Sequence, residues 1–193
     1  NNIVITGSAG KTSVKDLTGY CLNKLTRTFY SKKSFNNKYG VPLSIFNTPQ
    51  SKKFTVLEVG MNKKGEIDHL TKLIKPNLGI ITNISYAHIE NFKNLNQIAK
   101  AKGEMIDNII PNGTMVINMD DRYGDHFLKK AKNKKLKEIT FSKKKQNVDV
   151  FFLNKKSHKK YFLFNFKIKN KKKSFLISKD LSNYKENILA SIS

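Results

Sequence analysis

The sequence predicts an α/β fold: a mostly parallel, P-loop-type sheet with helices on both faces, plus a small antiparallel β section near the C-terminal end. Three observations support this prediction. Short apolar, β-branched runs alternate with helical patterns over residues 1–141. A glycine-containing loop joins the first run to the first helical pattern. From about residue 148 to 178, apolar runs follow one another without helices between them. Alternation of strand and helix is typical of a parallel sheet, and consecutive strands are typical of an antiparallel one.

The individual elements follow from these patterns in chain order. Buried strands are predicted over residues 3–6, 54–60, 78–84, 114–119 and 138–141. Helices are predicted over residues 11–25, 65–74, 94–109 and 122–132. The β-rich runs 148–153, 161–169 and 174–178 are separated by lysine-rich segments, which we expect to form the turns of a hairpin or meander. A last helix is expected to begin near Leu181.

Length and composition limit the class of protein. At 193 residues and 22.1 kDa the chain can bury a real core, and we take residues 1–193 as one domain. It has no apolar run of about 18 residues and no secretory signal, so neither a membrane-spanning helix nor secretion is expected. Cys21 is the only cysteine, which excludes an internal disulfide and favours a reducing, cytoplasmic setting. We expect Cys21 itself to be a small core residue.

The net charge of +23 raises the alternative of a non-enzymatic module that binds polyanions. Arg27 and Arg122 are the only arginines among 37 basic residues, so nearly all of the charge is lysine. Proteins that read nucleic acids usually depend on the planar, bidentate side chain of arginine. A solvated lysine coat is therefore the favoured interpretation, with no specific nucleic-acid partner.

The strongest motif is the loop T-G-S-A-G-K-T-S at residues 6–13, which follows a strand and opens a helix. Its glycines allow backbone N–H groups to point at phosphate oxygens, helped by the helix N-terminus. Lys11 would contribute positive charge to the phosphates and Thr12 a hydroxyl to Mg²⁺. The loop is a shortened G-x-x-G-K-T, because Ile5 stands where a full Walker A loop has its first glycine. The alternative is an ordinary strand-to-helix turn followed by an incidental Lys-Thr pair.

Three further side chains are candidates for the same site. Glu58 ends a strand, where open α/β sheets bind ligands, and it could hold Mg²⁺ beside Thr12. The alternative for Glu58 is a surface or capping role. His88 also follows a strand, although a lone histidine is more often structural. Lys102 lies in a predicted helix and, judged on the residues alone, is a solvated lysine.

With these residues in place, the chain resembles the central ATP-binding domain of the Mur ligase superfamily. The resemblance runs over the whole chain through TGSAGKTS, FNNKYGVPL, LEVGMNKKGEI, TNISYAHIENF, AKAKGEM and NMDD, in that order. The loop alone marks the superfamily. The Asn-Asn-x-x-Gly-Val-Pro-Leu and Ala-His-x-Glu-x-Phe segments are most similar to the branch of UDP-N-acetylmuramoyl-tripeptide:D-alanyl-D-alanine ligases.

The resemblance implies roles for matching residues. Those implied to bind nucleotide are Gly7, Ser8, Ala9, Gly10, Lys11, Thr12, Ser13 and Asn187. Those implied to hold two Mg²⁺ ions are Thr12, Glu58, His88 and Lys102, the last as a CO2-derived carbamate. The implied catalytic residues are Lys11, His88 and Lys102, and Asn36 and Asn37 would face the substrate. Two positions depart from the family: Ala9 replaces a usual asparagine, and Tyr184 replaces the first asparagine of the adenine helix.

The activity implied is ATP-driven amide-bond formation through an acyl phosphate, with UDP-MurNAc-peptide and D-Ala-D-Ala as substrates, in a cytoplasmic monomer. The chain begins on a strand and ends within a helix, so we expect a fragment that lacks an N-terminal UDP-binding domain and a C-terminal ligase domain. An alternative within the same superfamily is a ligase of the folylpolyglutamate-synthase or cyanophycin-synthetase type, which has the same ATP site and another acceptor.

Overall fold

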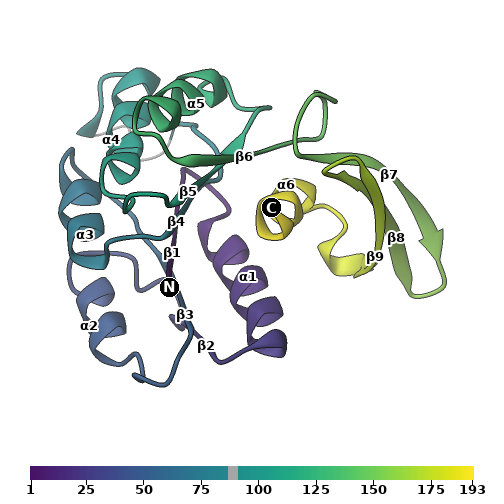
Figure 1. Cartoon of the computed structure of the whole chain (residues 1–193), viewed down its shortest axis with the longest axis horizontal. Helices are drawn as coiled ribbons and strands as arrows, with labels where there is room; N and C mark the ends of the chain where they lie inside the picture. Colours follow the sequence, from purple (N-terminus) through teal and green to yellow (C-terminus); the bar gives the residue numbers. More distant parts are fainter. Residues whose placement is uncertain (87–90) are drawn as a thin grey trace.

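The computed structural model describes residues 1–86 and 91–193, and His88 lies outside these ranges. The described strands form one nine-stranded sheet in the order β2-β3-β1-β4-β5-β6-β7-β8-β9 (Figure 1). The strands are β1 (Asn2–Thr6), β2 (Thr28–Tyr30), β3 (Phe54–Glu58), β4 (Leu78–Ile81), β5 (Thr114–Asn118), β6 (Lys137–Ser142), β7 (Val150–His158), β8 (Tyr161–Ile168) and β9 (Lys171–Ser178). The helices are α1 (Lys11–Leu25), α2 (Gly40–Phe46), α3 (Glu66–Ile74), α4 (Leu95–Asp107), α5 (Gly124–Asn133), a 3₁₀ turn (Lys179–Leu181) and α6 (Lys185–Ile192).

The part of the sheet from β2 to β7 is parallel, as the sequence predicts. Strand β1 lies between β3 and β4, with Ile5 opposite Glu58 and Thr6 opposite Ile81. The carboxyl ends of these three strands therefore meet at one edge, beside the loop that leads into α1. Open α/β sheets bind ligands outside this edge, where neighbouring connections diverge.

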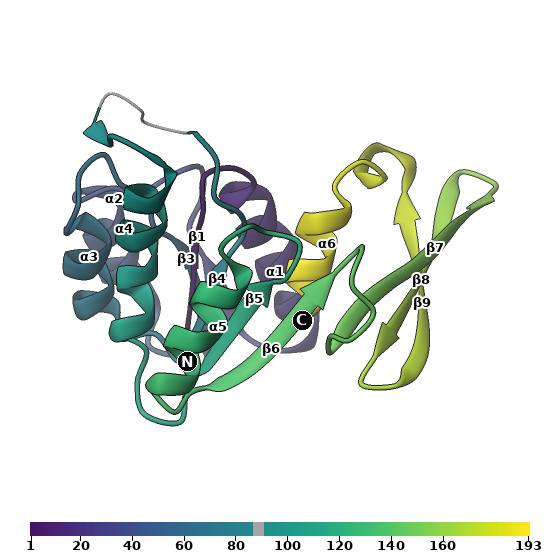
Figure 2. The same ribbon diagram turned by 90° about the horizontal axis from the view of Figure 1, so that it is seen from above.

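Helices cover both faces of the parallel sheet and bury two separate apolar layers (Figures 1 and 2). Helices α2 to α5 lie on one face, where residues such as Ile67 and Met105 pack against the strands. Helices α1 and α6 lie together on the other face, where Val14 and Leu189 are completely buried. The β-branched strand residues between these layers are buried from both sides, which explains the continuous apolar runs in the sequence.

The antiparallel section is continuous with the main sheet, because β7 pairs in parallel with β6 and antiparallel with β8. The sequence-based prediction placed turns in the lysine runs, and both turns do fall there, at residues 159–160 and 169–170, but they are shorter than the runs. Strand β7 continues to His158 and β9 begins at Lys171, so most of these lysines lie within strands, whose backbone pairing tolerates solvated side chains. The turn between β8 and β9 has Lys169 and Asn170 at φ 43° and 66°, the two positive values that a tight two-residue hairpin turn requires.

Other differences concern short or peripheral segments. Strand β2 and helix α2 were not predicted, since three residues show no periodicity and Pro42 obscures a seven-residue helix. The last helix begins at Lys185, after a 3₁₀ turn, instead of near Leu181. Cys21 is exposed and not in the core; it lines an apolar hollow between α1, α6 and β9. No helix in the described ranges combines the length and apolar character needed to span a membrane.

Candidate functional site

The predicted phosphate loop forms the connection from β1 to α1, and its glycines are required by close packing. Gly10 is the N-cap of α1 and adopts a left-handed conformation with φ 79°. Gly7 has φ 148°, and a Cβ at this position would lie 1.9 Å from Thr82 Oγ1. The first turn of α1 leaves main-chain N–H groups without intrahelical acceptors, which is the arrangement that binds phosphate.

Residues 82–83, which follow β4, hydrogen-bond to the phosphate loop and hold it in place. Ser8 donates its main-chain N–H to the Asn83 carbonyl over 2.9 Å, and Ala9 donates its own to Asn83 Oδ1 over 3.0 Å. Thr82 Oγ1 donates to the Ala9 carbonyl over 2.6 Å. The N–H groups of Ser8 and Ala9 thus have protein acceptors in this structure, so the phosphate contacts predicted for these two residues stay predictions. The N–H groups in the first turn of α1 are better placed to bind a phosphate than those of Ser8 and Ala9, because they lack intrahelical acceptors.

Two lysines from distant parts of the chain meet on one carbonyl. Lys11 Nζ donates to the Gly7 carbonyl over 3.0 Å, and Lys102 Nζ, from α4, donates to the same oxygen over 2.9 Å. Burial, and then the nearby Lys11 charge, lowers the pKa of Lys102 from 10.5 to about 7. Burial also lowers the pKa of Lys11, with the charge of Glu58 acting in the opposite direction. Lys102 is therefore not the solvated helical lysine that its residue type suggested.

Glu58 is a buried carboxylate with spare capacity to bind a cation. Its side chain has no exposed surface, and Oε1 accepts a hydrogen bond of 2.6 Å from Asn36 Nδ2. The structure gives Oε2 no hydrogen-bond partner among the described residues. A buried carboxylate oxygen without a donor is costly unless a cation or water completes it. The donor set fits Mg²⁺, which takes one or two carboxylates and fills its remaining positions with phosphate and water.

Thr12 lies at the start of α1, and its hydroxyl is 3.2 Å from Ser34 Oγ. Among the residues that the structure describes, no three His, Cys, Asp or Glu side chains form a metal-binding group. A magnesium site here would depend on Glu58, on the Thr12 hydroxyl and on oxygens of the nucleotide. His88, predicted to help hold a second ion, lies outside the described residues, so its role remains a prediction.

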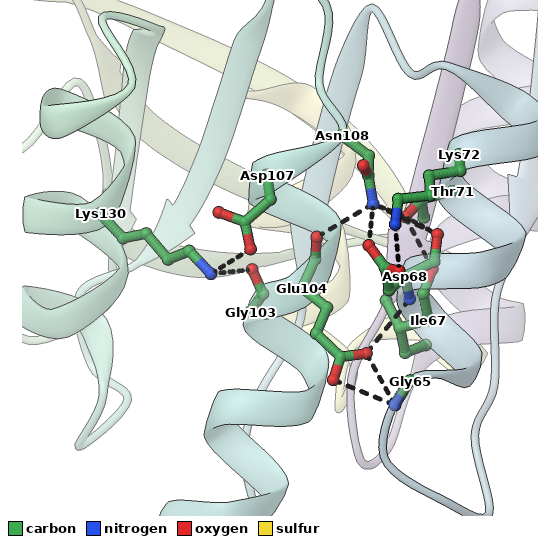
Figure 3. A network of polar contacts seen from close by, with 10 residues as sticks. All are labelled: Gly65, Ile67, Asp68, Thr71, Lys72, Gly103, Glu104, Asp107, Asn108 and Lys130. Carbon is green, nitrogen blue, oxygen red and sulfur yellow. Dashed lines mark hydrogen bonds and ion pairs between the residues drawn. The ribbon is translucent and has the colours of Figure 1, made fainter.

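The position of Lys102 depends on how α4 packs against α3. A polar network at the N-terminus of α3 holds the two helices together (Figure 3). The Glu104 carboxylate accepts the main-chain N–H groups of Gly65, over 3.1 Å, and Asp68, over 3.2 Å. Asn108 Nδ2 donates to Asp68 Oδ1 over 3.0 Å. Burial raises the pKa of Glu104, while the two N–H donors act against that change. Glu104 thus caps a neighbouring helix and ties the Lys102 helix to it.

A cavity of about 750 Å³ opens beside the loop and reaches from Lys11 to Leu70. Both asparagines predicted to face the substrate line it, and Asn37 Oδ1 also accepts the N–H groups of Tyr39 and Gly40 at the start of α2. The lysines that line the cavity are Lys11, Lys38, Lys63 and Lys64. The cavity is large enough for part of an extended substrate, and its positive charge favours an anionic one.

Asn187 reaches the phosphate loop from α6. A Cβ on Gly10 would come within 2.7 Å of Asn187 Oδ1, so the two residues are in close contact. Tyr184 precedes Asn187 by one helical turn and is 47% exposed. An ion pair between Glu186 and Lys143 links α6 to the segment after β6.

The structure therefore brings together most of the predicted residues: the loop, Glu58, Lys102, Asn36 and Asn187 surround one edge of the sheet. Sequence reasoning missed Asn83, which holds the loop, and Lys15, whose buried ammonium donates to the Ser31 and Lys33 carbonyls. Asn83 follows the end of β4, where a polar residue could have been noticed, whereas one lysine among so many gave no signal.

Comparison with known proteins gives a consistent result. The Mur ligase middle domain family matches residues 5–192. A UDP-N-acetylmuramoyl-tripeptide–D-alanyl-D-alanine ligase of Buchnera aphidicola subsp. Acyrthosiphon pisum is 35% identical over 166 residues, covering 86% of this chain and 34% of that protein. MurF of Acinetobacter baumannii superposes with a TM-score of 0.88 at 26% identity, over 100% of this chain and 41% of that one. MurF ligase of Thermotoga maritima in complex with ADP gives 0.84 at 25% identity, over 100% and 44%. The chain spans about a third of the length of the curated relatives it matches.

Proposed function

The chain belongs to the Mur ligases, as their middle domain, and on that premise we propose that it is the ATP-binding part of an enzyme that joins D-alanyl-D-alanine to a UDP-N-acetylmuramoyl-tripeptide. One observation carries the chemical part of this proposal. Lys11 and Lys102 converge on the Gly7 carbonyl, while the fully buried Glu58 carboxylate is close enough to influence the Lys11 pKa. Buried cations beside a buried carboxylate suit a site that gathers phosphate and Mg²⁺.

Each residue of the site has a defined task under this proposal. The main-chain N–H groups at the start of α1 and the Lys11 ammonium bind the triphosphate, and Asn187 contacts the base side of the nucleotide. Thr12 and Glu58 hold Mg²⁺, with Lys102 as a further ligand when it carries a carbamate. The bound ion supplies positive charge that offsets the repulsion between two anions. Asn36 and Asn37 face the peptide substrate in the cavity.

Carbamylation of Lys102 is supported by its environment. CO2 reacts only with a neutral amine, and a lysine with the ordinary pKa of 10.5 is neutral in about one molecule in a thousand at pH 7.5. Because burial lowers the pKa of Lys102 to about 7, roughly three quarters of the molecules carry the neutral amine at the same pH. The resulting carbamate is an anion, and it would replace one of two neighbouring positive charges.

The reaction is the joining of a carboxylate and an amine at the expense of ATP. A carboxylate oxygen of the tripeptide forms a bond to the γ-phosphorus, and the bond to the bridging oxygen breaks, releasing ADP. The amine of D-alanyl-D-alanine then attacks the acyl carbon, the C–O bond to phosphate breaks, and the amine proton passes to solvent. Lys11 stabilises the charge that moves onto the bridging and γ-phosphate oxygens in the first step.

The nucleotide site is tested by calorimetry of Mg-ATP binding to this chain at low and moderate salt. We expect Mg²⁺-dependent binding that Lys11→Ala abolishes. Lys24→Ala is the matched control, since Lys24 is exposed on the same helix. Binding that ignores both Mg²⁺ and Lys11, and whose logarithm falls steeply with the logarithm of salt, would instead identify a polyanion-binding surface.

The substrates are tested in a chimera in which residues 5–192 replace the matching part of the Acinetobacter baumannii enzyme, which superposes on the whole chain. Phosphate release that requires both UDP-N-acetylmuramoyl-tripeptide and D-alanyl-D-alanine is the expected result. A chimera that still binds Mg-ATP but releases no phosphate with these two substrates would refute the proposed substrates and favour the other class of ligase.

A further inference from the structure

Lys15 is a buried cation that the proposed reaction does not use. It lies one helical turn after Lys11 on α1, so the two side chains share a face of the helix. Its side chain has no exposed surface, and it is among the largest fully buried side chains described. Burying an ammonium group costs several kcal/mol unless it is well paired. The position therefore needs an explanation beyond the filling of space, which methionine or leucine would do without that cost.

The ammonium of Lys15 is completely satisfied, and mostly by main-chain carbonyls. Lys15 Nζ donates to the Ser31 carbonyl over 2.5 Å and to the Lys33 carbonyl over 2.8 Å. The carboxylate of the adjacent Asp16 lies 3.1 Å away. These three partners match the three N–H donors of a lysine. Lys15 thus clamps the segment that follows β2 onto the helix that carries the phosphate loop.

The clamped segment contacts two of the proposed protein ligands of Mg²⁺, Thr12 and Glu58. Ser34 Oγ is 3.2 Å from the Thr12 hydroxyl, and Asn36 Nδ2 donates to Glu58 Oε1 over 2.6 Å. The Asn36 carbonyl also accepts the Gly60 N–H over 2.7 Å, which holds this end of the segment to the end of β3. The segment is therefore fixed at one end by Lys15 and at the other by the end of β3, and its residues Ser34 and Asn36 contact the two metal donors.

The backbone at Lys33 indicates that the clamp constrains the segment. Lys33 has φ 55°, in the left-handed region that residues with a side chain adopt at a cost of about 1 kcal/mol or more. This conformation accompanies the contact between the Lys33 carbonyl and the buried ammonium. The Lys33 side chain itself is exposed, so the strained backbone serves the carbonyl and not the side chain.

We propose that Lys15 is a positioning residue, which fixes segment 31–36 so that Ser34 and Asn36 hold the Thr12 hydroxyl and the Glu58 carboxylate in place for Mg²⁺. The inference rests on the proposed nucleotide-binding function and adds a cause for its metal dependence. The phosphate loop and the metal donors are coupled through one buried side chain, so a change at Lys15 alters metal binding without touching the phosphate contacts.

The decisive variant changes the backbone and leaves the buried ammonium in place. Lys33→Pro fixes φ near −65° and turns the carbonyl away from Lys15, whereas Lys33→Gly removes the same exposed side chain and keeps the positive φ accessible. ATP binding is measured by calorimetry without Mg²⁺ and across a Mg²⁺ titration. Hydrogen exchange of the amides in segment 31–36 is measured in parallel. Lys15→Met is a second variant, which removes the clamp directly.

We expect Lys33→Pro to raise the Mg²⁺ concentration that gives half of the full increase in ATP affinity. The rise should be on the order of fivefold to tenfold, the size expected for one lost buried hydrogen bond. The ATP affinity of Lys33→Pro without Mg²⁺ should stay within about twofold of that of the starting chain. Lys33→Gly should match the starting chain in its Mg²⁺ dependence. Hydrogen exchange in segment 31–36 should speed up only in Lys33→Pro and Lys15→Met. Equal Mg²⁺ dependence in the proline and glycine variants would overturn the role of Lys15 alone. A starting chain whose ATP binding ignores Mg²⁺ would overturn the proposed function and this inference with it.

Discussion

The titration of Lys102 makes stability depend on pH in a direction that can be measured. Burial lowers the pKa of Lys102 in the folded chain to about 7, whereas in the unfolded chain it returns to about 10.5. Between these values the unfolded state binds a proton that the folded state does not. The free energy of unfolding therefore rises with pH across this window. Below about pH 6 Lys102 is protonated in both states, so its unfavourable contribution is at its largest and no longer changes with pH.

The size of the effect follows from the two pKa values. The slope is at most about 1.4 kcal/mol per pH unit, and integration from pH 7 to pH 9 gives about 2 kcal/mol. Lys102→Met removes this contribution because methionine does not titrate. The variant should thus be more stable than the starting chain at pH 7, and its advantage should shrink by about 2 kcal/mol at pH 9.

Urea unfolding of both chains at pH 7, 8 and 9, in CO2-depleted buffer, measures this difference. The two chains differ only at residue 102, so pH effects common to both cancel in the comparison. Lys100→Met is the matched control, because Lys100 is exposed on the same helix, and its stability should run parallel to that of the starting chain. A stability gap for Lys102→Met that stays constant from pH 7 to pH 9 would show that Lys102 has an ordinary pKa and would refute the reasoning.

Three further results are expected. Glu58→Gln should abolish Mg²⁺-dependent ATP binding in calorimetry. It should also raise the free energy of unfolding by on the order of 1 kcal/mol, because an amide removes a buried, incompletely paired charge. A lower free energy of unfolding would contradict this expectation. Gly10→Ala and Gly65→Ala should each cost about 1–2 kcal/mol for a left-handed backbone, but only Gly10→Ala, whose Cβ meets Asn187, should also weaken nucleotide binding. Carbon-13 NMR with labelled bicarbonate near pH 8 should show a carbamate signal that Lys102→Ala removes, and a signal that survives the substitution would place the carbamate elsewhere.

The fold was largely predictable because its strands are buried on both faces. Runs such as residues 54–60 and 114–119 are apolar and β-branched, and the helices between them have clear periodicity, so the architecture could be inferred without any contact information. The failures have a different physical origin. The three residues of β2 are held by pairing with β3, and the lysines of β7 and β9 are held by backbone hydrogen bonds to β8. Neither kind of stabilisation leaves a pattern in side-chain type.

The site was predictable only where a side chain is placed by the strand or helix that carries it. Lys11 follows the loop glycines directly, and Glu58 ends a strand, so local sequence was enough for both. Lys102 reaches the loop across 95 residues of chain, and its role came from family resemblance and not from the residues around it.

The buried lysines of the site differ from the solvated surface lysines because their ammonium groups donate to main-chain carbonyls. In the structure, Lys11 and Lys102 donate to the Gly7 carbonyl, and Lys15 donates to two carbonyls of the segment after β2. Every residue type has a main-chain carbonyl, so such an acceptor leaves no trace in the sequence, whereas a carboxylate partner would. In a chain of net charge +23, the number of lysines says little about the site. A lysine of the site differs from a solvated lysine because main-chain oxygens replace water around its ammonium group. The tertiary structure alone decides whether such oxygens are present.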